Sequence, residues 1–201
     1  MYFCGKMEDK QLYIISGCNG AGKTTASYTV LPKILQCQEF VNADEIAHGL
    51  SPFNPESVAI EAGRLMLRRI QELLSKNVSF SIETTLATRS YFNLVNKARM
   101  QGYKITLLYF WLSSPELAEQ RVAERVRKGG HNIPLDVIHA RYYRGIYNLF
   151  NIYMPIVDSW IIADNSQLPR EIIAEGGKGK NNTIYNLIKY QTIENYVRQR
   201  I

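Results

Sequence analysis

The sequence predicts an α/β protein in three layers, with a parallel sheet of about five strands and helices on both faces. Short apolar segments alternate with segments of helical length along most of the 201 residues, which is typical of repeated βαβ units. A glycine-rich segment follows the first apolar segment and opens the first helix, at the edge of the sheet where ligands bind in such proteins. Hydrophobic residues make up 46% of the chain and charged residues 21%, so we expect a packed core and not intrinsic disorder.

Five segments are predicted to be strands, because each is short, apolar and bounded by turn or helix signals. Near-continuous apolar runs of this kind are typical of strands that are buried on both faces of a parallel sheet. In chain order they are residues 11–16, 39–42, 78–82, 104–112 and 156–163.

Helix signals lie between these strands. A helix from about Gly22 to Val30 is expected to end at Pro32, which cannot continue the hydrogen-bond pattern. Asn54 is expected to cap a second helix, and Pro55 to be its first residue. This helix is predicted to extend to about residue 76. Its predicted buried face consists of Ala59, Ala62, Met66, Ile70 and Leu73.

Three further helices complete the central part of the chain. One is expected at residues 88–101, where Gly102 stops it. Ser114 and Pro115 repeat the cap-and-proline start, and that helix ends at two glycines, residues 129–130. Another runs over residues 134–152, and its aromatic residues recur at near-helical spacing, which favours core packing over substrate stacking.

We expect residues 1–175 to form one domain with a lid at about residues 116–144. Residues 176–201 would add a glycine-rich turn and a C-terminal helix, predicted at residues 183–198 and packed on the same domain. No internal repeat and no long linker divides the chain.

The charge of the chain is concentrated. The net charge is +6, and the six basic and two acidic residues between Arg121 and Arg144 contribute +4 of it. This concentration favours one anionic site over a nucleic-acid backbone. No apolar run approaches the ~20 residues of a membrane helix, and the first ten residues contain no apolar leader segment, so we expect a cytoplasmic protein. Its three cysteines match no disulfide or zinc framework, and its three histidines show no ligand spacing.

Residues 17–24 satisfy the phosphate-loop pattern G-x-x-x-x-G-K-[ST], directly after a predicted strand and at the start of a helix. The glycines allow successive backbone N–H groups to point at phosphate oxygens, and the positive end of the helix adds to the attraction. Lys23 is expected to reach the β- and γ-phosphates, and the Thr24 hydroxyl to ligate Mg²⁺. The predicted nucleotide-binding residues are Gly17, Cys18, Asn19, Gly20, Ala21, Gly22, Lys23, Thr24 and Thr25.

Cys18 allows two interpretations. A thiol near a helix N-terminus can have a lowered pKa and be reactive. We favour the alternative, in which Cys18 is a small residue that fills space in the loop.

Two acidic residues follow neighbouring strands and are expected beside the phosphate loop. Asp44 is interpreted as a base that accepts a proton from a substrate hydroxyl, or as the cap of the segment that follows it. Glu83 ends an apolar strand, where an unpaired carboxylate would be costly. It could bind the hydroxyls of the acceptor or hold a water molecule on the magnesium ion.

The basic stretch completes the predicted site. Arg121, Arg125 and Lys128 share one helix face, and Arg141 and Arg144 stand on the next helix beyond a loop that contains His131. A lid of this form would bring guanidinium groups to the transferred phosphoryl group and would exclude water. A solvated basic face is the alternative. His131 is expected either to touch phosphate or to stabilise the lid turn.

Missing motifs distinguish the chain from two other classes of nucleotide-binding protein. The chain has no Walker B strand with a second acid, no LSGGQ-like signature and no N-K-x-D guanine motif. These absences argue against a transport ATPase and against a GTPase.

With these residues, the chain resembles the zeta-toxin-like family of P-loop kinases, in its short stand-alone branch. The resemblance implies a kinase fold, ATP and Mg²⁺ as cofactors, and a small antitoxin protein that inhibits by obstructing the nucleotide site. Toxin members of the family phosphorylate a UDP-activated N-acetylated amino sugar. The matching segments are GCNGAGKTT (17–25), FVNADEIA (40–47), SPFNPES (51–57), SFSIETTL (79–86), ELAEQRVAERVRKGGHNIP (116–134), RYYR (141–144) and DNS (164–166).

The resemblance also implies roles for single residues. Asp44 matches the aspartate that activates the hydroxyl, and Glu83 matches a substrate-binding glutamate. Arg121, Arg125 and Arg141 resemble contacts to the γ-phosphate. Asn165 lies in a segment similar to the loop that flanks the adenine base in related kinases.

The hypothesis that follows is an ATP-dependent kinase with an alcohol acceptor, a UDP-N-acetylglucosamine-like sugar nucleotide being the first choice. Lys23, Asp44, Glu83, Arg121, Arg125 and Arg141 are its predicted catalytic residues. Two alternatives stay open: a nucleotide or RNA 5′-kinase, and a non-catalytic NTP-binding partner protein.

Overall fold

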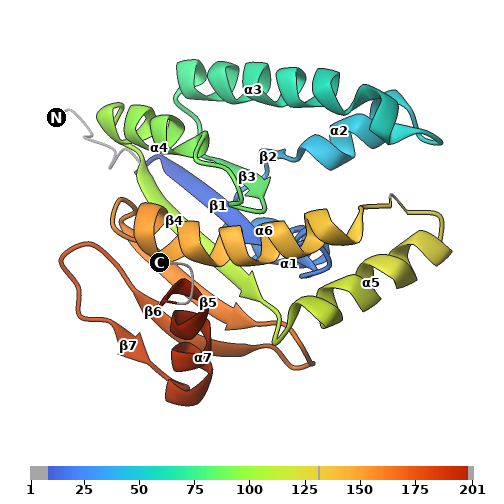
Figure 1. Cartoon of the computed structure of the whole chain (residues 1–201). Coiled ribbons are helices and arrows are strands. Elements are labelled where there is room, and N and C mark those ends of the chain that lie inside the picture. Colours follow the sequence, from blue (N-terminus) through green and yellow to red (C-terminus); the bar gives the residue numbers. More distant parts are fainter. Residues whose placement is uncertain (1–8, 131, 199–201) are drawn as a thin grey trace, which may run out of the picture.

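The fold is described from a computed structural model that covers residues 9–130 and 132–198 (Figure 1). The residues outside these ranges are 1–8, 131 and 199–201. The predictions for Cys4, for His131 and for most of the first ten residues therefore lie outside the described residues.

One mixed sheet forms the middle layer of the molecule. The described strands lie in the order β2-β3-β1-β4-β5-β6-β7. The first five pair in parallel, whereas β6 pairs antiparallel with β5 and with β7. The predicted parallel sheet is thus confirmed and extended at one edge. The strands are β1 (Gln11–Gly17), β2 (Phe40–Val41), β3 (Phe80–Thr84), β4 (Lys104–Trp111), β5 (Ser159–Asp164), β6 (Glu171–Gly176) and β7 (Thr183–Ile184).

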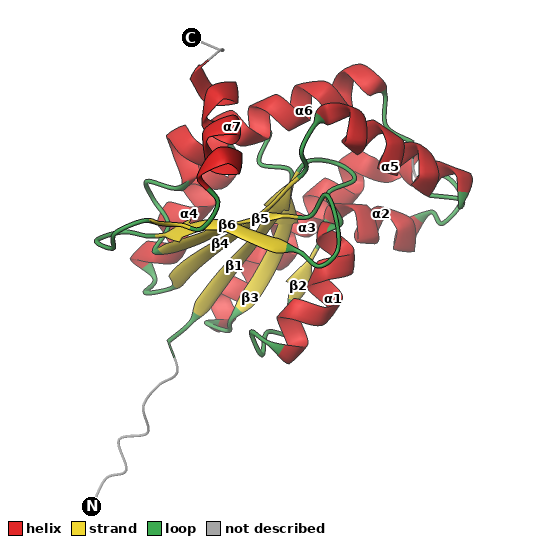
Figure 2. Ribbon diagram, turned by 90° about the horizontal axis from the view of Figure 1, so that it is seen from below, coloured by secondary structure: helices red, strands yellow, loops and turns green. Residues whose placement is uncertain are grey.

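Helices cover both faces of the sheet, as predicted. Figure 2 shows α6 and α7 on one face and α1 on the other. The helix that precedes β3 begins with a turn of 3-10 helix, and the helix that precedes β5 ends in a π-helical segment. The helical elements are α1 (Lys23–Lys33), α2 (Ala43–Leu50), η1 (Pro55–Val58), α3 (Ala59–Lys76), α4 (Tyr91–Met100), α5 (Pro115–Arg127), α6 (Leu135–Asn148), η2 (Leu149–Tyr153) and α7 (Leu187–Arg198).

Several helix boundaries follow the predicted signals. The Ser114 hydroxyl accepts a hydrogen bond from the Leu117 N–H at 3.2 Å and caps α5. Four of the five residues predicted to form the apolar face of α3 are buried, and only Ala59 is exposed. The sequence pattern of this helix therefore indicates its core-facing side.

Several local features differ from the predictions. Pro32 lies inside α1, which continues to Lys33 because the Ile34 N–H still bonds to the Val30 carbonyl at 3.0 Å. A helix not predicted from the sequence, α2, follows β2, and its cap is the side chain of Asn42 and not of Asp44, which contributes its N–H instead.

The predicted final helix, residues 183–198, begins only at Leu187. The two residues of β7 precede it and pair with β6. Strand β6 itself was missed because its two buried residues, Ile173 and Ala174, lie between acidic residues and a glycine, which gives a weak strand pattern.

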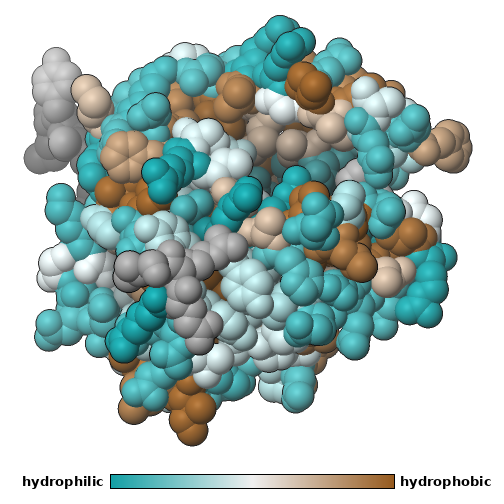
Figure 3. Space-filling view, viewed as in Figure 1, coloured by the Kyte–Doolittle hydropathy of each residue, from teal (hydrophilic) through white to brown (hydrophobic). Residues whose placement is uncertain are grey.

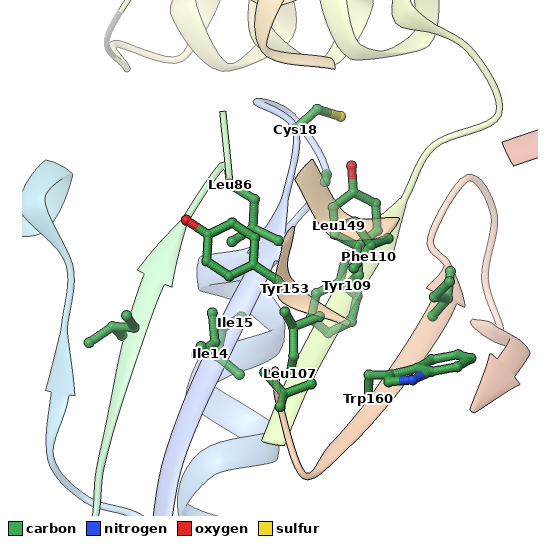
Figure 4. Close-up of a cluster of buried hydrophobic side chains, with 14 of the residues drawn as sticks. Ile14, Ile15, Cys18, Leu86, Leu107, Tyr109, Phe110, Leu149, Tyr153 and Trp160 are labelled. Carbon is green, nitrogen blue, oxygen red and sulfur yellow. The ribbon is translucent and has the colours of Figure 1, made fainter. Parts of the chain in front are cut away.

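The core lies against both faces of the central strands. Figure 4 shows Tyr153 and Leu149, from the π-helical segment, packed with Leu86 near residues of β1 and β4. Tyr142 and Tyr153 are fully buried, and their hydroxyls donate to the Leu112 and Thr88 carbonyls at 2.7 and 2.8 Å. Core packing is therefore confirmed for these two aromatic residues.

On the face drawn in Figure 3, hydrophobic residues form small groups that hydrophilic residues separate. Among residues 9–130 and 132–198, no helix combines the length and the apolar character required to span a bilayer.

Two glycines in helices give a stability prediction. A Cβ atom on Gly145 of α6 would lie 2.7 Å from the Thr85 carbonyl oxygen, whereas one on Gly63 of α3 would meet no atom within 4 Å. We therefore expect Gly145→Ala to lower the free energy of unfolding by about 1–3 kcal/mol through overpacking. Gly63→Ala should raise it by about 0.5–1 kcal/mol, because alanine has the higher helix propensity. Urea denaturation measures both, and equal effects would contradict this close approach of α6.

Candidate active site

The candidate site lies at the carboxyl ends of β1 and β3, which are neighbours in the sheet. Ile15 of β1 is paired with Glu83 of β3, and Ser16 with Thr84. The phosphate loop leaves β1 one residue later and leads into α1. The parallel register therefore sets the Glu83 carboxylate beside the first turn of α1.

The start of α1 is built to receive an anion. Gly22 is its N-terminal cap residue, with a φ of 73° that favours glycine, and no side chain caps the first turn. The N–H groups of that turn thus remain available to an anion, and the helix dipole favours negative charge there. A Cβ atom on Gly22 would lie 2.7 Å from Asn165 Nδ2, so the loop also needs glycine here for space.

Lys23 is buried and lies against its own loop. Its Nζ donates to the Cys18 carbonyl oxygen at 3.0 Å and lies 3.7 Å from Glu83 Oε1. The side chains of Lys23 and Glu83 are each only 8% exposed, so the pair interacts in a region that water screens weakly.

The Glu83 carboxylate is the centre of a polar cluster. It accepts hydrogen bonds from the Thr24 hydroxyl at 2.8 and 3.1 Å and from Asn42 Nδ2 at 3.1 Å. Burial raises the pKa of Glu83, and the charge of Lys23 and the bond from Thr24 offset part of that rise. Hydroxyl and carboxylate oxygens are the ligands that Mg²⁺ prefers, so the residues present fit this ion.

Asn42 was missed by the sequence analysis. Its Oδ1 caps α2 through the Asp44 N–H at 2.8 Å, while its Nδ2 reaches Glu83. The available signal was its position directly after β2, at the same edge of the sheet as the phosphate loop.

The predicted lid residues reach the phosphate loop. Arg121, Arg125 and Lys128 line one cavity of about 640 Å³ together with Lys23, Thr24, Asp44 and Glu83. Arg141, on α6, donates to Asn19 Oδ1 at 3.3 Å. The structure thus brings the predicted arginines to the loop, whereas Arg144 is exposed and does not line this cavity.

A second cavity, of about 270 Å³, adjoins the first between α2, the start of α3 and the end of α5. Asp44, His48, Arg125 and Gly130 line both cavities. His48 was not predicted as a site residue, although it lies four residues after Asp44 on α2 and therefore on the same helix face.

Asn165 contacts the far side of the phosphate loop. Its Nδ2 donates to the Ala21 carbonyl oxygen at 2.6 Å, and its Oδ1 accepts from Arg170 Nε at 2.8 Å. The guanidinium of Arg170 lies over the ring of Phe110, 5.7 Å from the centroid.

Cys18 is a buried residue at the carboxyl end of β1 (Figure 4). Burial raises the pKa of its thiol to about 11, and the nearby charge of Lys23 offsets only part of this effect. The environment therefore favours a residue that fills space over a reactive thiolate.

Comparisons with known proteins match most of the chain. A family model described as Zeta toxin matches residues 3–166. An uncharacterized protein of Haemophilus influenzae is 29% identical over 136 residues, which are 68% of this chain and 94% of that protein.

Two solved structures are similar in fold. A complex of AvrRxo1-ORF1 and AvrRxo1-ORF2 with ATP superposes with a TM-score of 0.73 at 17% identity, over 92% of this chain and 63% of that one. The PezAT chromosomal toxin–antitoxin system of Streptococcus pneumoniae gives a TM-score of 0.64 at 15% identity, over 98% and 88% of the two chains. This chain thus has an α/β P-loop fold, and it spans 63% of the matched AvrRxo1 chain, which is less than two thirds of it.

The burial of Cys18 gives a prediction about its reactivity. At pH 8 we expect iodoacetamide to modify Cys18 about 100-fold more slowly in the folded protein than in the unfolded one, because little thiolate forms at a pKa of about 11. Peptide mapping by mass spectrometry distinguishes Cys18 from the other cysteines. Equal rates in the two states would show an accessible, reactive loop thiol.

Proposed function

The chain belongs to the zeta toxin family, and we propose that it is a kinase that transfers the γ-phosphoryl group of ATP to a hydroxyl group of a small metabolite. The observation that carries the proposal is the position of Asp44, which lines both the cavity at the phosphate loop and the smaller cavity beside it. A carboxylate at that boundary can face a hydroxyl in one cavity and a phosphoryl group in the other.

The larger cavity supplies the groups that phosphoryl transfer requires. The N–H groups at the start of α1 would hold the phosphates, and Lys23 would leave the Cys18 carbonyl to bind the β- and γ-phosphates. Arg121 and Arg125, from the lid, would stabilise the negative charge on the transferred group. The N–H groups at the start of α1 are already uncapped, so within the phosphate loop it is Lys23 that has to exchange its hydrogen-bond partner when the nucleotide binds.

Thr24 and Glu83 would hold Mg²⁺, the hydroxyl as a direct ligand and the carboxylate directly or through water. When bound, the ion supplies charge neutralisation between the phosphate oxygens. The contacts of Glu83 with Thr24 and Lys23 support this role over contact with the hydroxyls of the acceptor. Asn42 would keep the carboxylate oriented through its 3.1 Å hydrogen bond.

Asp44 would orient the acceptor hydroxyl and accept its proton. Asp44 is exposed, and Arg125 and Gly130, at the end of α5 and just after it, line the same cavity. An acceptor between them would exclude water, which would otherwise take the phosphoryl group. His48, on the same helix face, would contact the acceptor rather than the nucleotide base.

The first acceptor to examine is a sugar nucleotide of the UDP-N-acetylglucosamine type, which the family resemblance implies. Arg125 beside the smaller cavity, with Lys128 beside the larger one, supports an anionic acceptor. A small antitoxin protein is the proposed partner, because the similar PezAT structure is described as a toxin–antitoxin system.

Incubation with Mg-ATP and separate acceptors tests the activity. We expect ADP release that depends on a sugar nucleotide and a product that carries one additional phosphoryl group by mass spectrometry. Phosphorylation of RNA or nucleotide 5′-hydroxyls, with binding that weakens steeply as salt rises, would identify the 5′-kinase alternative. ATP binding without transfer to any acceptor would identify a non-catalytic NTP-binding protein.

Replacement of the proposed base gives a second test. Asp44→Asn should lower kcat by about 10²–10⁴-fold, because the amide cannot accept the hydroxyl proton, while the Kd for Mg-ATP stays unchanged. Glu61→Gln, which removes an exposed carboxylate from the first turn of α3, is the matched control and should keep the wild-type kcat. An Asp44→Asn protein that is as active as the control would remove the proposed base.

A further inference from the structure

The C-terminal helix α7 contacts the end of β5 through an ion pair. Lys189 Nζ donates to Asp164 Oδ2 at 2.6 Å and to Glu171 Oε2 at 2.6 Å. The side chain of Asp164, the last residue of β5, is only 8% exposed, and that of Lys189 is 33% exposed. Lys189 therefore joins α7 to β5 and β6, which pair antiparallel with each other.

The position of Lys189 is itself fixed. Asn186 Oδ1 accepts from the Lys189 N–H at 3.0 Å, and Asn186 Nδ2 donates to Glu171 Oε1 at 2.7 Å. The start of α7 is thus anchored to Glu171 of β6 by the side chain of Asn186 as well as by that of Lys189.

The second oxygen of Asp164 holds the turn that follows β5. Asp164 Oδ1 accepts from the Ser166 N–H at 2.8 Å, so each carboxylate oxygen has a partner. Burial acts to raise the pKa of Asp164, but the hydrogen bonds from Lys189 and Ser166 outweigh it and lower the pKa. The Asp164–Ser166 turn is therefore built on an ionised carboxylate whose cation comes from α7.

This turn braces the candidate nucleotide site on two sides. Asn165 Nδ2 donates to the Ala21 carbonyl oxygen of the phosphate loop at 2.6 Å. The Ser166 carbonyl oxygen accepts from Arg121 Nη2 of the lid at 2.8 Å. The Asp164–Ser166 turn thus contacts both the phosphate loop and Arg121, which would bind the phosphates together.

We propose that Lys189 is a positioning residue for nucleotide binding, which holds the Asp164–Ser166 turn in the conformation that braces Ala21 and Arg121. The inference rests on the proposed function, because it takes the phosphate loop to bind ATP. Without Lys189, the buried carboxylate of Asp164 loses its cation and draws water or another cation into the turn. The contacts to Ala21 and Arg121 are then no longer held in one geometry, and ATP binds less tightly.

The Kd for Mg-ATP, measured by calorimetry on the full chain, tests the inference without any acceptor. We expect Lys189→Met to raise this Kd about 3- to 10-fold. With an acceptor present, KM for ATP should rise more than kcat falls. Lys189→Arg, which keeps the cation, should restore most of the affinity. Arg198→Met is the matched control, because Arg198 pairs with Glu194 on the same helix at 3.6 Å and is 73% exposed.

The control should bind Mg-ATP as the wild type does. A merely structural role for Lys189 would lower the thermal unfolding temperature of Lys189→Met and leave its Kd unchanged, and that result overturns the inference. A wild-type chain that binds no Mg-ATP would instead overturn the proposed function, which keeps the two failures distinct.

A double variant covers the case in which Lys189→Met does not fold. Asp164→Asn with Lys189→Met removes both charges, so no buried charge is left unpaired. Because α7 no longer braces the turn, the Kd of the double variant for Mg-ATP should exceed that of the wild type by a factor similar to that expected for Lys189→Met. A folded double variant with the wild-type Kd contradicts the proposal.

Discussion

The candidate site depends on one buried carboxylate. Glu83 is taken out of water by the parallel pairing of β3 with β1, and that burial would be costly without partners. Lys23 and Thr24, from the first turn of α1, and Asn42, directly after β2, supply them. The first turn of α1, the end of β2 and the end of β3 are thereby held together at one point. Moving any one of these elements would leave a charge or a donor unsatisfied.

Around this carboxylate, different elements provide the groups that would hold the phosphates and the arginines that would contact the transferred phosphoryl group. The sheet and α1 provide the loop amides and the polar cluster, while α5 and the middle of α6 provide the arginines. Two residues that line both cavities, Asp44 and His48, lie on α2, a short helix whose N-terminal cap is a residue of the polar cluster. Asp44 and Glu83 are thus linked through Asn42, so that the proposed base and the proposed ion site are positioned by the same side chain.

The sequence predicted those parts of the molecule that are encoded locally. The phosphate loop was predicted from the spacing of Gly17 to Thr24, and β1 and β4 were predicted from their apolar runs. The start of α5 was predicted from the Ser114 cap. The missed parts depend on contacts between distant segments. Strand β6 exists because it pairs with β5, and α2 is short and begins at an asparagine whose second role is visible only beside Glu83. The lid arginines were predicted from their spacing. The ion pair of Lys189 could not be predicted in this way, because its partner Asp164 lies 25 positions earlier in the chain.

The two outermost strands of the sheet have a consequence for association between copies of the chain. Both β2 and β7 contain only two residues. Neither border therefore presents a row of free amides and carbonyls long enough to template a strand from another molecule. The shortness of β2 and β7 therefore protects the sheet from edge-to-edge aggregation, although neither strand contains a proline or a charged residue.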